Sequence, residues 1–139
     1  PRRGADGTLS FTLPMGDRKL PGIAAEDIGR CAYGIFKKGG DYVGRTVGIA
    51  GEHLTGAEMA AALTAALGQP VRYDAVTPEA YRGLGFPGAD DLGNMFQFKR
   101  DFADYFCGAR APAVARSLNP ALQTFGEWLA ANKHRIPLS

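Results

Sequence analysis

The feature that most constrains the fold is one helix in the middle of the chain whose start and end are both marked. Thr55 and Glu58 form the pattern of a capping box, in which the hydroxyl accepts a free backbone N–H and the carboxylate reaches back. An alanine-rich run of high helix propensity follows and stops at Gly68, a residue suited to end a helix. Short apolar stretches typical of strands flank it at 45–50 and 71–76. Strand, helix and strand in succession predict a mixed α/β fold.

Further strands and helices are expected on both sides of this helix. Residues 8–13 alternate apolar and polar side chains, which predicts a strand. Residues 25–38 predict a helix with acids in its first turn and lysines in its last, the order that the helix dipole favours. Its apolar face would comprise Ile28, Ala32, Ile35 and Phe36. Later helices are expected at 78–83, at 90–106 and after a second capping box at Thr124 and Glu127, with 110–116 as a connection. The fold class predicted is therefore α/β, or an α+β fragment, with strands early and only helices late.

Charge and cysteine content exclude several classes of protein. The 16 basic and 14 acidic side chains leave a net charge of +2, and the two signs are mixed, unlike the basic stripe of a nucleic-acid-binding domain. Cys31 and Cys107 lie far apart and form neither a disulfide framework nor a zinc pattern, and the apolar runs are too short to span a membrane. We expect a cytoplasmic protein with free thiols that binds neither nucleic acid nor membrane directly.

Three motifs that could carry chemistry have simpler interpretations. Residues 83–88 match GxGxxG, but a predicted helix rather than a strand precedes them, so the dinucleotide mechanism lacks its context. Tyr33 and Lys37 have the spacing of a dehydrogenase pair, yet Lys37 lies where the helix dipole alone favours a lysine. His53 and His134 have no second ligand at metal spacing. We therefore expect no catalytic, cofactor-binding or metal-binding residue in this chain.

The most unusual local feature is a concentration of aromatic side chains between residues 86 and 106. They are Phe86, Phe96, Phe98, Phe102, Tyr105 and Phe106. The helical spacing from Met95 through Phe98 to Phe102 favours a hydrophobic core. The alternative is that these rings form the wall of a ligand cleft or a surface for a partner protein. Binding of single-stranded nucleic acid is a weaker alternative, because the surrounding charge is mixed.

Nearly the whole chain from Leu9 resembles the C-terminal half of NmrA-like proteins, relatives of the extended short-chain dehydrogenases. The stretches that carry the resemblance are 13–17, 25–29, 42–44, 47–50, 77–81, 84–89, 92–96, 118–120 and 128–129. The most specific are the GFPGA of residues 85–89 and the NMF of residues 94–96. The resemblance implies that residues 1–139 are the C-terminal region of such a protein, whose N-terminal Rossmann part would bind NADP or NAD.

The same resemblance implies roles for particular residues. Asp27 would cap or brace the helix that it opens, and residues 45–50 would add a late strand to the Rossmann sheet. The candidates for this half's contribution to a cleft for substrate or partner are Tyr81, Phe86, Pro87, Met95 and Phe96.

For the intact protein, the resemblance favours an NAD(P)-binding redox sensor or regulator that acts through a protein partner. The alternative is an NAD(P)H-dependent reductase, for instance of quinones, in which this half lines the cleft for a small-molecule substrate. A cofactor-independent interaction module is a third, weaker alternative. Whether the intact protein is an enzyme or forms a homodimer stays open at this level.

Overall fold

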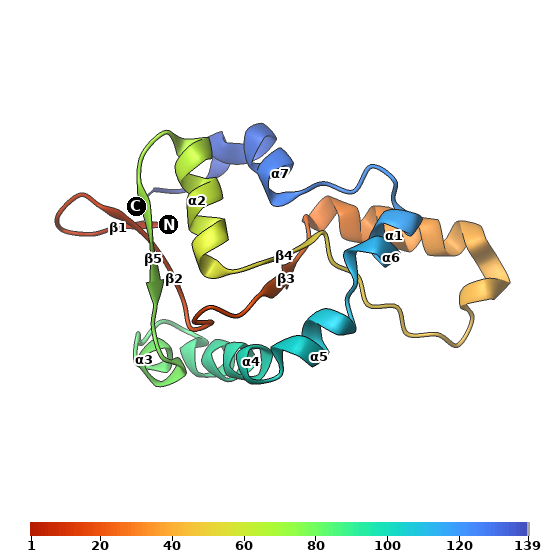
Figure 1. The fold of residues 1–139 in the computed structure, drawn as a ribbon, viewed down its shortest axis with the longest axis horizontal. Helices are drawn as coiled ribbons and strands as arrows, with labels where there is room; N and C mark the ends of the chain where they lie inside the picture. Colours follow the sequence, from red (N-terminus) through yellow and green to blue (C-terminus); the bar gives the residue numbers. More distant parts are fainter. Residues whose placement is uncertain (139) are drawn as a thin grey trace.

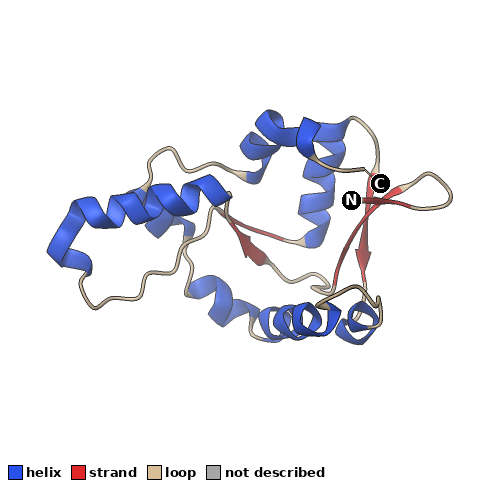
Figure 2. Ribbon diagram, turned by 180° about the vertical axis from the view of Figure 1, so that it is seen from behind, coloured by secondary structure: helices blue, strands red, loops and turns tan. Residues whose placement is uncertain are grey.

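The computed structural model, which describes residues 1–138, places two small sheets among seven helices (Figures 1 and 2). The strands are β1 (Arg2–Arg3), β2 (Leu9–Leu13), β3 (Leu20–Gly22), β4 (Glu52–Leu54) and β5 (Val71–Ala75). The helices are α1 (Ala25–Lys38), α2 (Gly56–Leu67), α3 (Pro78–Arg82), α4 (Ala89–Asp101), α5 (Ala103–Gly108), α6 (Pro112–Leu118) and α7 (Phe125–Asn132). Short 3₁₀ turns follow α1 at Gly39–Tyr42 and α7 at Lys133–Arg135. The mixed α/β class predicted from the sequence is confirmed.

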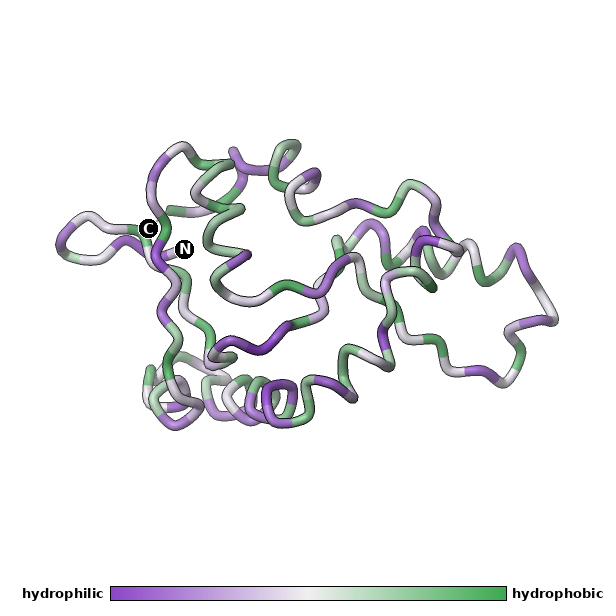
Figure 3. Tube along the Cα trace, viewed as in Figure 1, coloured by the Kyte–Doolittle hydropathy of each residue, from purple (hydrophilic) through white to green (hydrophobic). Residues whose placement is uncertain are grey.

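The three-stranded sheet lies at the end of the molecule where the two termini meet (Figure 1). Its order is β1-β2-β5, with β1 and β2 antiparallel and β2 and β5 parallel, so that Leu9 pairs with Val71. A buried cluster joins the sheet to α2 and α7 through Leu9, Ala60, Leu63, Val71 and Leu129. The trace of α2 is correspondingly dominated by hydrophobic residues in Figure 3. This cluster is the larger of the two hydrophobic cores.

The helix that anchors this core forms as the sequence predicts. The Thr55 hydroxyl accepts the Glu58 amide at 3.2 Å, and the Glu58 carboxylate accepts the Thr55 amide at 2.8 Å. At the other end, Gly68 takes a left-handed conformation with φ of 69°, which costs glycine nothing. The second capping box, at Thr124 and Glu127, opens α7 in the same way.

A second cluster joins α1 to α6 at the opposite end of the molecule. Cys31, Ala115, Leu118 and Leu122 are its buried members. The two helices approach closely at Gly34, where an added Cβ would lie 2.2 Å from the Leu118 carbonyl oxygen. Small residues on α1 therefore decide which of its faces is buried. The apolar face predicted from the sequence is instead largely exposed, with Ile28 at 49% and Phe36 at 80% of their full surface.

Three other expectations about local structure are wrong. The helix expected over 90–106 is broken at Phe102, whose φ of −115° and ψ of 35° end α4 and start α5. Residues 110–116, expected to be a connection, contribute most of α6. Residues 45–50 form no strand, because no other strand of residues 1–138 lies beside them to pair with. The short β3–β4 ribbon, with three residues in each strand, was not expected at all.

The core interpretation of the aromatic stretch is also wrong. Phe98, Phe102 and Tyr105 are 47%, 56% and 71% exposed, and none of the aromatic residues from 86 to 106 is fully buried. Their helices, α4 and α5, run along one edge of the molecule, and only small residues such as Gly93 and Ala103 face inward (Figure 1). The spacing was helical, but the face that it defines points to solvent.

A candidate apolar cleft braced by Asp27

The β3–β4 ribbon, the N-terminal ends of α1 and α7, and α2 enclose a cleft of about 640 Å³. A volume of this size matches the pockets in which proteins hold small organic ligands. Its apolar wall is made by Leu20, Ile23, Leu54, Met59, Phe125 and Trp128. Polar groups join this wall at Glu26, Glu52, Gln123, Thr124 and Arg135. The cleft is therefore a mainly apolar cavity with a few polar groups that could orient a ligand.

The aromatic part of the wall comes from the first turn of α7. Thr124 caps the helix, and the Glu52 carboxylate of β4 accepts the Phe125 amide at 2.6 Å. Residues three apart on a helix share a face, so Phe125 and Trp128 lie on the same side of α7. The cap and Glu52 together fix the position of both rings at the cleft.

The second helix end at the cleft is the N-terminus of α1, which has no side-chain cap. Ala24 precedes α1 and has no side chain that could accept a hydrogen bond, so α1 begins without a side-chain cap. The amides of Ala25 and Glu26 donate to no acceptor within residues 1–138, and both residues line the cleft. Free amides at a helix N-terminus carry partial positive charge. A ligand oxygen in the cleft could accept hydrogen bonds from them.

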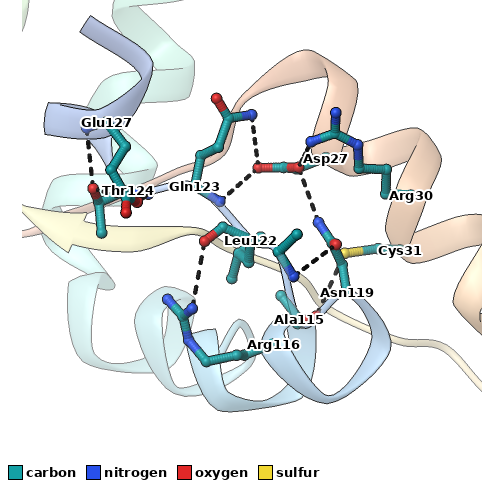
Figure 4. Close-up of polar contacts among 11 residues, drawn as sticks. Asp27, Arg30, Cys31, Ala115, Arg116, Asn119, Leu122, Gln123, Thr124 and Glu127 are labelled. Atoms are coloured by element: carbon teal, nitrogen blue, oxygen red, sulfur yellow. Dashed lines mark hydrogen bonds and ion pairs between the residues drawn. The ribbon is translucent and has the colours of Figure 1, made fainter. Parts of the chain in front are cut away.

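Directly behind this helix end, the Asp27 carboxylate ties α1 to the segment between α6 and α7 (Figure 4). Its Oδ1 accepts from Arg30 Nη1 and from Asn119 Nδ2, each at 2.9 Å. Its Oδ2 accepts from the backbone amide and the side-chain amide of Gln123 at 2.9 and 3.3 Å. Asp27 is completely buried, and every lone-pair direction of its carboxylate is used. The bracing role implied by the family resemblance is therefore what the geometry provides.

The protonation state of Asp27 follows from these contacts. Burial by itself raises the pKa of the carboxyl, because an apolar environment disfavours the charged form. The hydrogen bonds from Gln123, Arg30 and Asn119 outweigh burial and hold the pKa of Asp27 below its ordinary value. Asp27 is accordingly an anion at neutral pH. It fixes Gln123, which itself lines the cleft.

The residues proposed from the sequence for a cleft lie elsewhere, on α3 and α4 and the loop between them. Three of them come together, since the Tyr81 ring meets the Phe86 ring at 5.7 Å and the Phe96 ring at 5.6 Å, both edge to face. Pro87 is exposed and Met95 is half-buried. A smaller hollow of about 410 Å³ includes only Phe86 of the five, together with Arg82, Asp90 and Asp91. A ligand role for Tyr81, Phe86, Pro87, Met95 and Phe96 stays a prediction.

Two sequence motifs of dinucleotide enzymes, the GxGxxG match at 83–88 and the Tyr33–Lys37 pair, lack the structural context that those motifs require. Gly83–Gly88 follow α3 rather than a strand, and Asp90 and Asp91 in the first turn of α4 would repel a pyrophosphate. Tyr33 is 65% exposed, and the Lys37 ammonium lies 5.7 Å from the centroid of its ring on the surface of α1. We therefore assign neither a cofactor nor a catalytic role to any of these residues.

No group of three potential metal ligands gathers anywhere within residues 1–138. Across the same range, none of the helices has the length and hydropathy that a crossing of the lipid bilayer requires.

Sequence reasoning missed the larger cleft. Its signal was present in Phe125 and Trp128, which stand just after a capping box and share one helix face. Nothing in the sequence indicated that β3 and β4 would pair and bring Leu20 and Leu54 opposite those rings. The aromatic stretch at 86–106 is denser in the sequence, and it lies along a different edge of the molecule, on α4 and α5.

The parallel β2–β5 pair and its covering helices match a portion of a Rossmann-like α/β fold. The match to the family model extends over residues 2–129, and the chain belongs to the NmrA-like family. It is 35% identical over 129 residues to an NAD(P)H azoreductase of Xenophilus azovorans, a match that covers 88% of this chain and 44% of that protein. The chain thus spans less than half the length of this relative.

Solved structures show the same fold at lower identity. NmrA, a negative transcriptional regulator solved in complex with NADP, superposes with a TM-score of 0.70 at 22% identity, over 92% of this chain and 44% of that one. A crystal of NmrA with NAD gives the same values. A nucleoside-diphosphate-sugar epimerase from Staphylococcus aureus superposes with a TM-score of 0.71 at 22% identity, over 87% and 43% of the two chains.

Proposed function

We propose that this chain forms the substrate-binding portion of an NAD(P)H-dependent reductase that acts on flat aromatic acceptors such as quinones or azo compounds. The apolar cleft of about 640 Å³ walled by Phe125 and Trp128 carries the proposal. An aromatic acceptor would pack against these two rings and displace water from the apolar wall. The 35% identity to an NAD(P)H azoreductase supports the same class of substrate.

The cleft also contains hydrogen-bond donors that could interact with such a substrate as it is reduced. Reduction of a quinone or azo group places negative charge on oxygen or nitrogen. The free amides of Ala25 and Glu26 at the start of α1 would donate hydrogen bonds to that oxygen or nitrogen, although the Glu26 and Glu52 carboxylates that also line the cleft oppose a full negative charge there. Asp27 and Gln123 would keep this helix end in place. We place the nicotinamide cofactor in a part of the intact protein outside these 139 residues, because the GxGxxG match at residues 83–88 follows the helix α3 and not a strand.

Trp128 provides a direct test, since it is the only tryptophan in the chain. Titration with 2-methyl-1,4-naphthoquinone should quench its fluorescence saturably, after correction for the light that the quinone absorbs. Leu54→Ala and Met59→Ala remove apolar wall groups and should each weaken binding about fivefold to tenfold. Phe86→Ala and Phe96→Ala are the matched controls, because they remove rings from the other candidate site. Absence of saturable quenching, or loss of binding only in the two phenylalanine variants, would contradict the assignment to this cleft.

The proposed activity is tested with an intact protein in which this chain is joined to the proposed cofactor-binding part. This protein should oxidise NADPH steadily when a quinone or an azo dye is present, and Leu54→Ala should raise KM more than it lowers kcat. A protein that binds NADPH tightly and never consumes it would overturn the reductase proposal.

That outcome would favour a second candidate, a cofactor-sensing regulator that acts through a partner protein. The similarity in fold to NmrA and the uncovered apolar face of α1 favour it. Ile28, Tyr33 and Phe36 are 49%, 65% and 80% exposed. Exposed apolar patches of this kind often mark surfaces that bind another protein. A regulator would lose partner binding, and no catalytic activity, when Phe36 is replaced by serine.

A further inference from the structure

Two cationic side chains, one at the end of α4 and one just after α5, have no anionic partner among residues 1–138. Lys99 lies in the last turn of α4, and Arg110 follows α5. Neither forms an ion pair with any carboxylate of residues 1–138. The break at Phe102 turns α5 so that both cations reach the Phe106 ring, with Lys99 Nζ 5.2 Å and Arg110 Cζ 3.7 Å from its centroid. Both positive charges therefore lie close to the same aromatic ring.

Lys99 is half-buried in this arrangement. Its ammonium also lies 5.7 Å from the centroid of the Phe96 ring, so two rings surround it. Burial and then the positive charge of Arg110 lower the pKa of Lys99, and no carboxylate acts in the opposite direction. Cation–π contacts to the two rings offset the loss of water around the ammonium only in part. An anion between the two cations would complete the site.

Arg110 has donors available for that anion. Its Nη1 donates to the Phe106 carbonyl oxygen at 3.2 Å, whereas its Nε and Nη2 donate to nothing within residues 1–138. A guanidinium presents its donors as a rigid planar fork that matches a carboxylate. Stacking on Phe106 fixes the plane of this fork.

Exposed rings continue directly from the two cations. Phe98 and Phe102 lie with their centroids 5.1 Å apart and are 47% and 56% exposed. The Phe98 ring also meets Phe106 edge to face at 6.3 Å. A ligand whose anionic group reached Lys99 and Arg110 would therefore lay its body on aromatic surface.

We propose that Lys99, Arg110 and the rings of Phe98, Phe102 and Phe106 form a binding site for small aromatic carboxylates. The carboxylate lies between the ammonium and the guanidinium, and the aryl ring packs on Phe98 and Phe102. This site shares no lining residue with the apolar cleft, so it stands independently of the proposed reductase activity.

The test is calorimetric titration of the 139-residue chain with 2-naphthoate. Saturable binding is expected, and Lys99→Gln and Arg110→Gln should each weaken it about tenfold, the effect of losing a hydrogen bond to a charged group. Lys37→Gln is the matched control: Lys37 also ends a helix and lies 5.7 Å from the centroid of one ring, Tyr33, but its neighbour Lys38 lies over a different ring, Tyr42, so the two cations share no ring. It should leave the affinity unchanged.

Two further ligands test the contributions of the charged groups and of the aromatic rings separately. The uncharged 2-naphthylmethanol should bind at least tenfold more weakly than 2-naphthoate, and acetate should not bind measurably. Binding of 2-naphthoate that survives both glutamine substitutions, in variants whose thermal unfolding matches that of the parent chain, would overturn the proposal. Equal affinity for acetate would overturn it as well, because the rings would then have no role.

Discussion

The Asp27 carboxylate accepts a 2.9 Å hydrogen bond from the side chain of Asn119, which lies 92 positions later in the chain. Both residues are buried, and the bond links α1 to the turn after α6. Asn119 is itself held in position, because its Oδ1 accepts the Ala121 amide at 3.2 Å. A single carboxylate thus joins the second core to the segment that leads into the cleft.

Replacing Asp27 with asparagine should destabilise the fold by about 3 kcal/mol, because buried donors that served a carboxylate would face an amide NH₂ group. Urea denaturation followed by circular dichroism would measure the change. Glu26→Gln, at the neighbouring exposed position, is the control and should change stability by less than about 0.5 kcal/mol. Similar values for the two variants would mean that the Asp27 network contributes little.

The same carboxylate predicts a pH dependence. The folded-state pKa of Asp27 is below its unfolded value, so its stabilisation is fully present above the unfolded pKa and is lost as pH falls through the folded pKa. The difference in unfolding free energy between the parent chain and Asp27→Asn should therefore shrink as pH falls from about 5 to about 2. Denaturant titrations at several pH values test this. A difference that stays constant over that range would rule out a depressed pKa.

Gly34 should be the glycine of α1 that least tolerates a side chain. An added Cβ would lie 2.2 Å from the Leu118 carbonyl oxygen, so Gly34→Ala must push α1 and α6 apart, at a cost of about 1–3 kcal/mol. Gly29→Ala lies in the same helix with nothing within 4 Å of the new methyl group, and it should stabilise the chain by up to about 1 kcal/mol. Thermal unfolding of both variants would test this opposition in sign, and destabilisation by Gly29→Ala would contradict it.

Truncation on the exposed face of α1 should affect stability far less than truncation in the core between α1 and α6. Phe36 is 80% exposed, so Phe36→Ala should change stability by no more than about 0.5 kcal/mol. Leu118, buried against α1, should cost about 2–5 kcal/mol on replacement by alanine. Denaturant unfolding of the two variants compares them. A large loss from Phe36→Ala would mean that some other part of the chain covers the apolar face in solution.

Much of the local structure could be predicted from the sequence because its signals are local. The capping boxes at Thr55 and Thr124 need only the backbone of one helix turn, and both helices begin where those residues indicate. The bounds of α1 likewise agree with its charge order and the glycines that follow it. Membership of the NmrA-like family could also be predicted from the sequence, because the resemblance rests on short stretches of residues in a fixed order.

Only the tertiary structure decided which surfaces are buried and where the cleft lies. The periodicity of the sequence identified an apolar face on α1. It did not indicate that α1 would instead pack against α6 through Gly34 and Cys31. No glycine or proline marks the break at Phe102, which brings α5 toward β3, where the Cys107 thiol donates to the Lys19 carbonyl at 3.6 Å. Burial depends on which elements meet, and the residues that meet here lie far apart in the chain. The physical reason is that hydrogen bonds within a turn are specified by neighbouring residues, whereas packing is specified by partners that local sequence cannot identify.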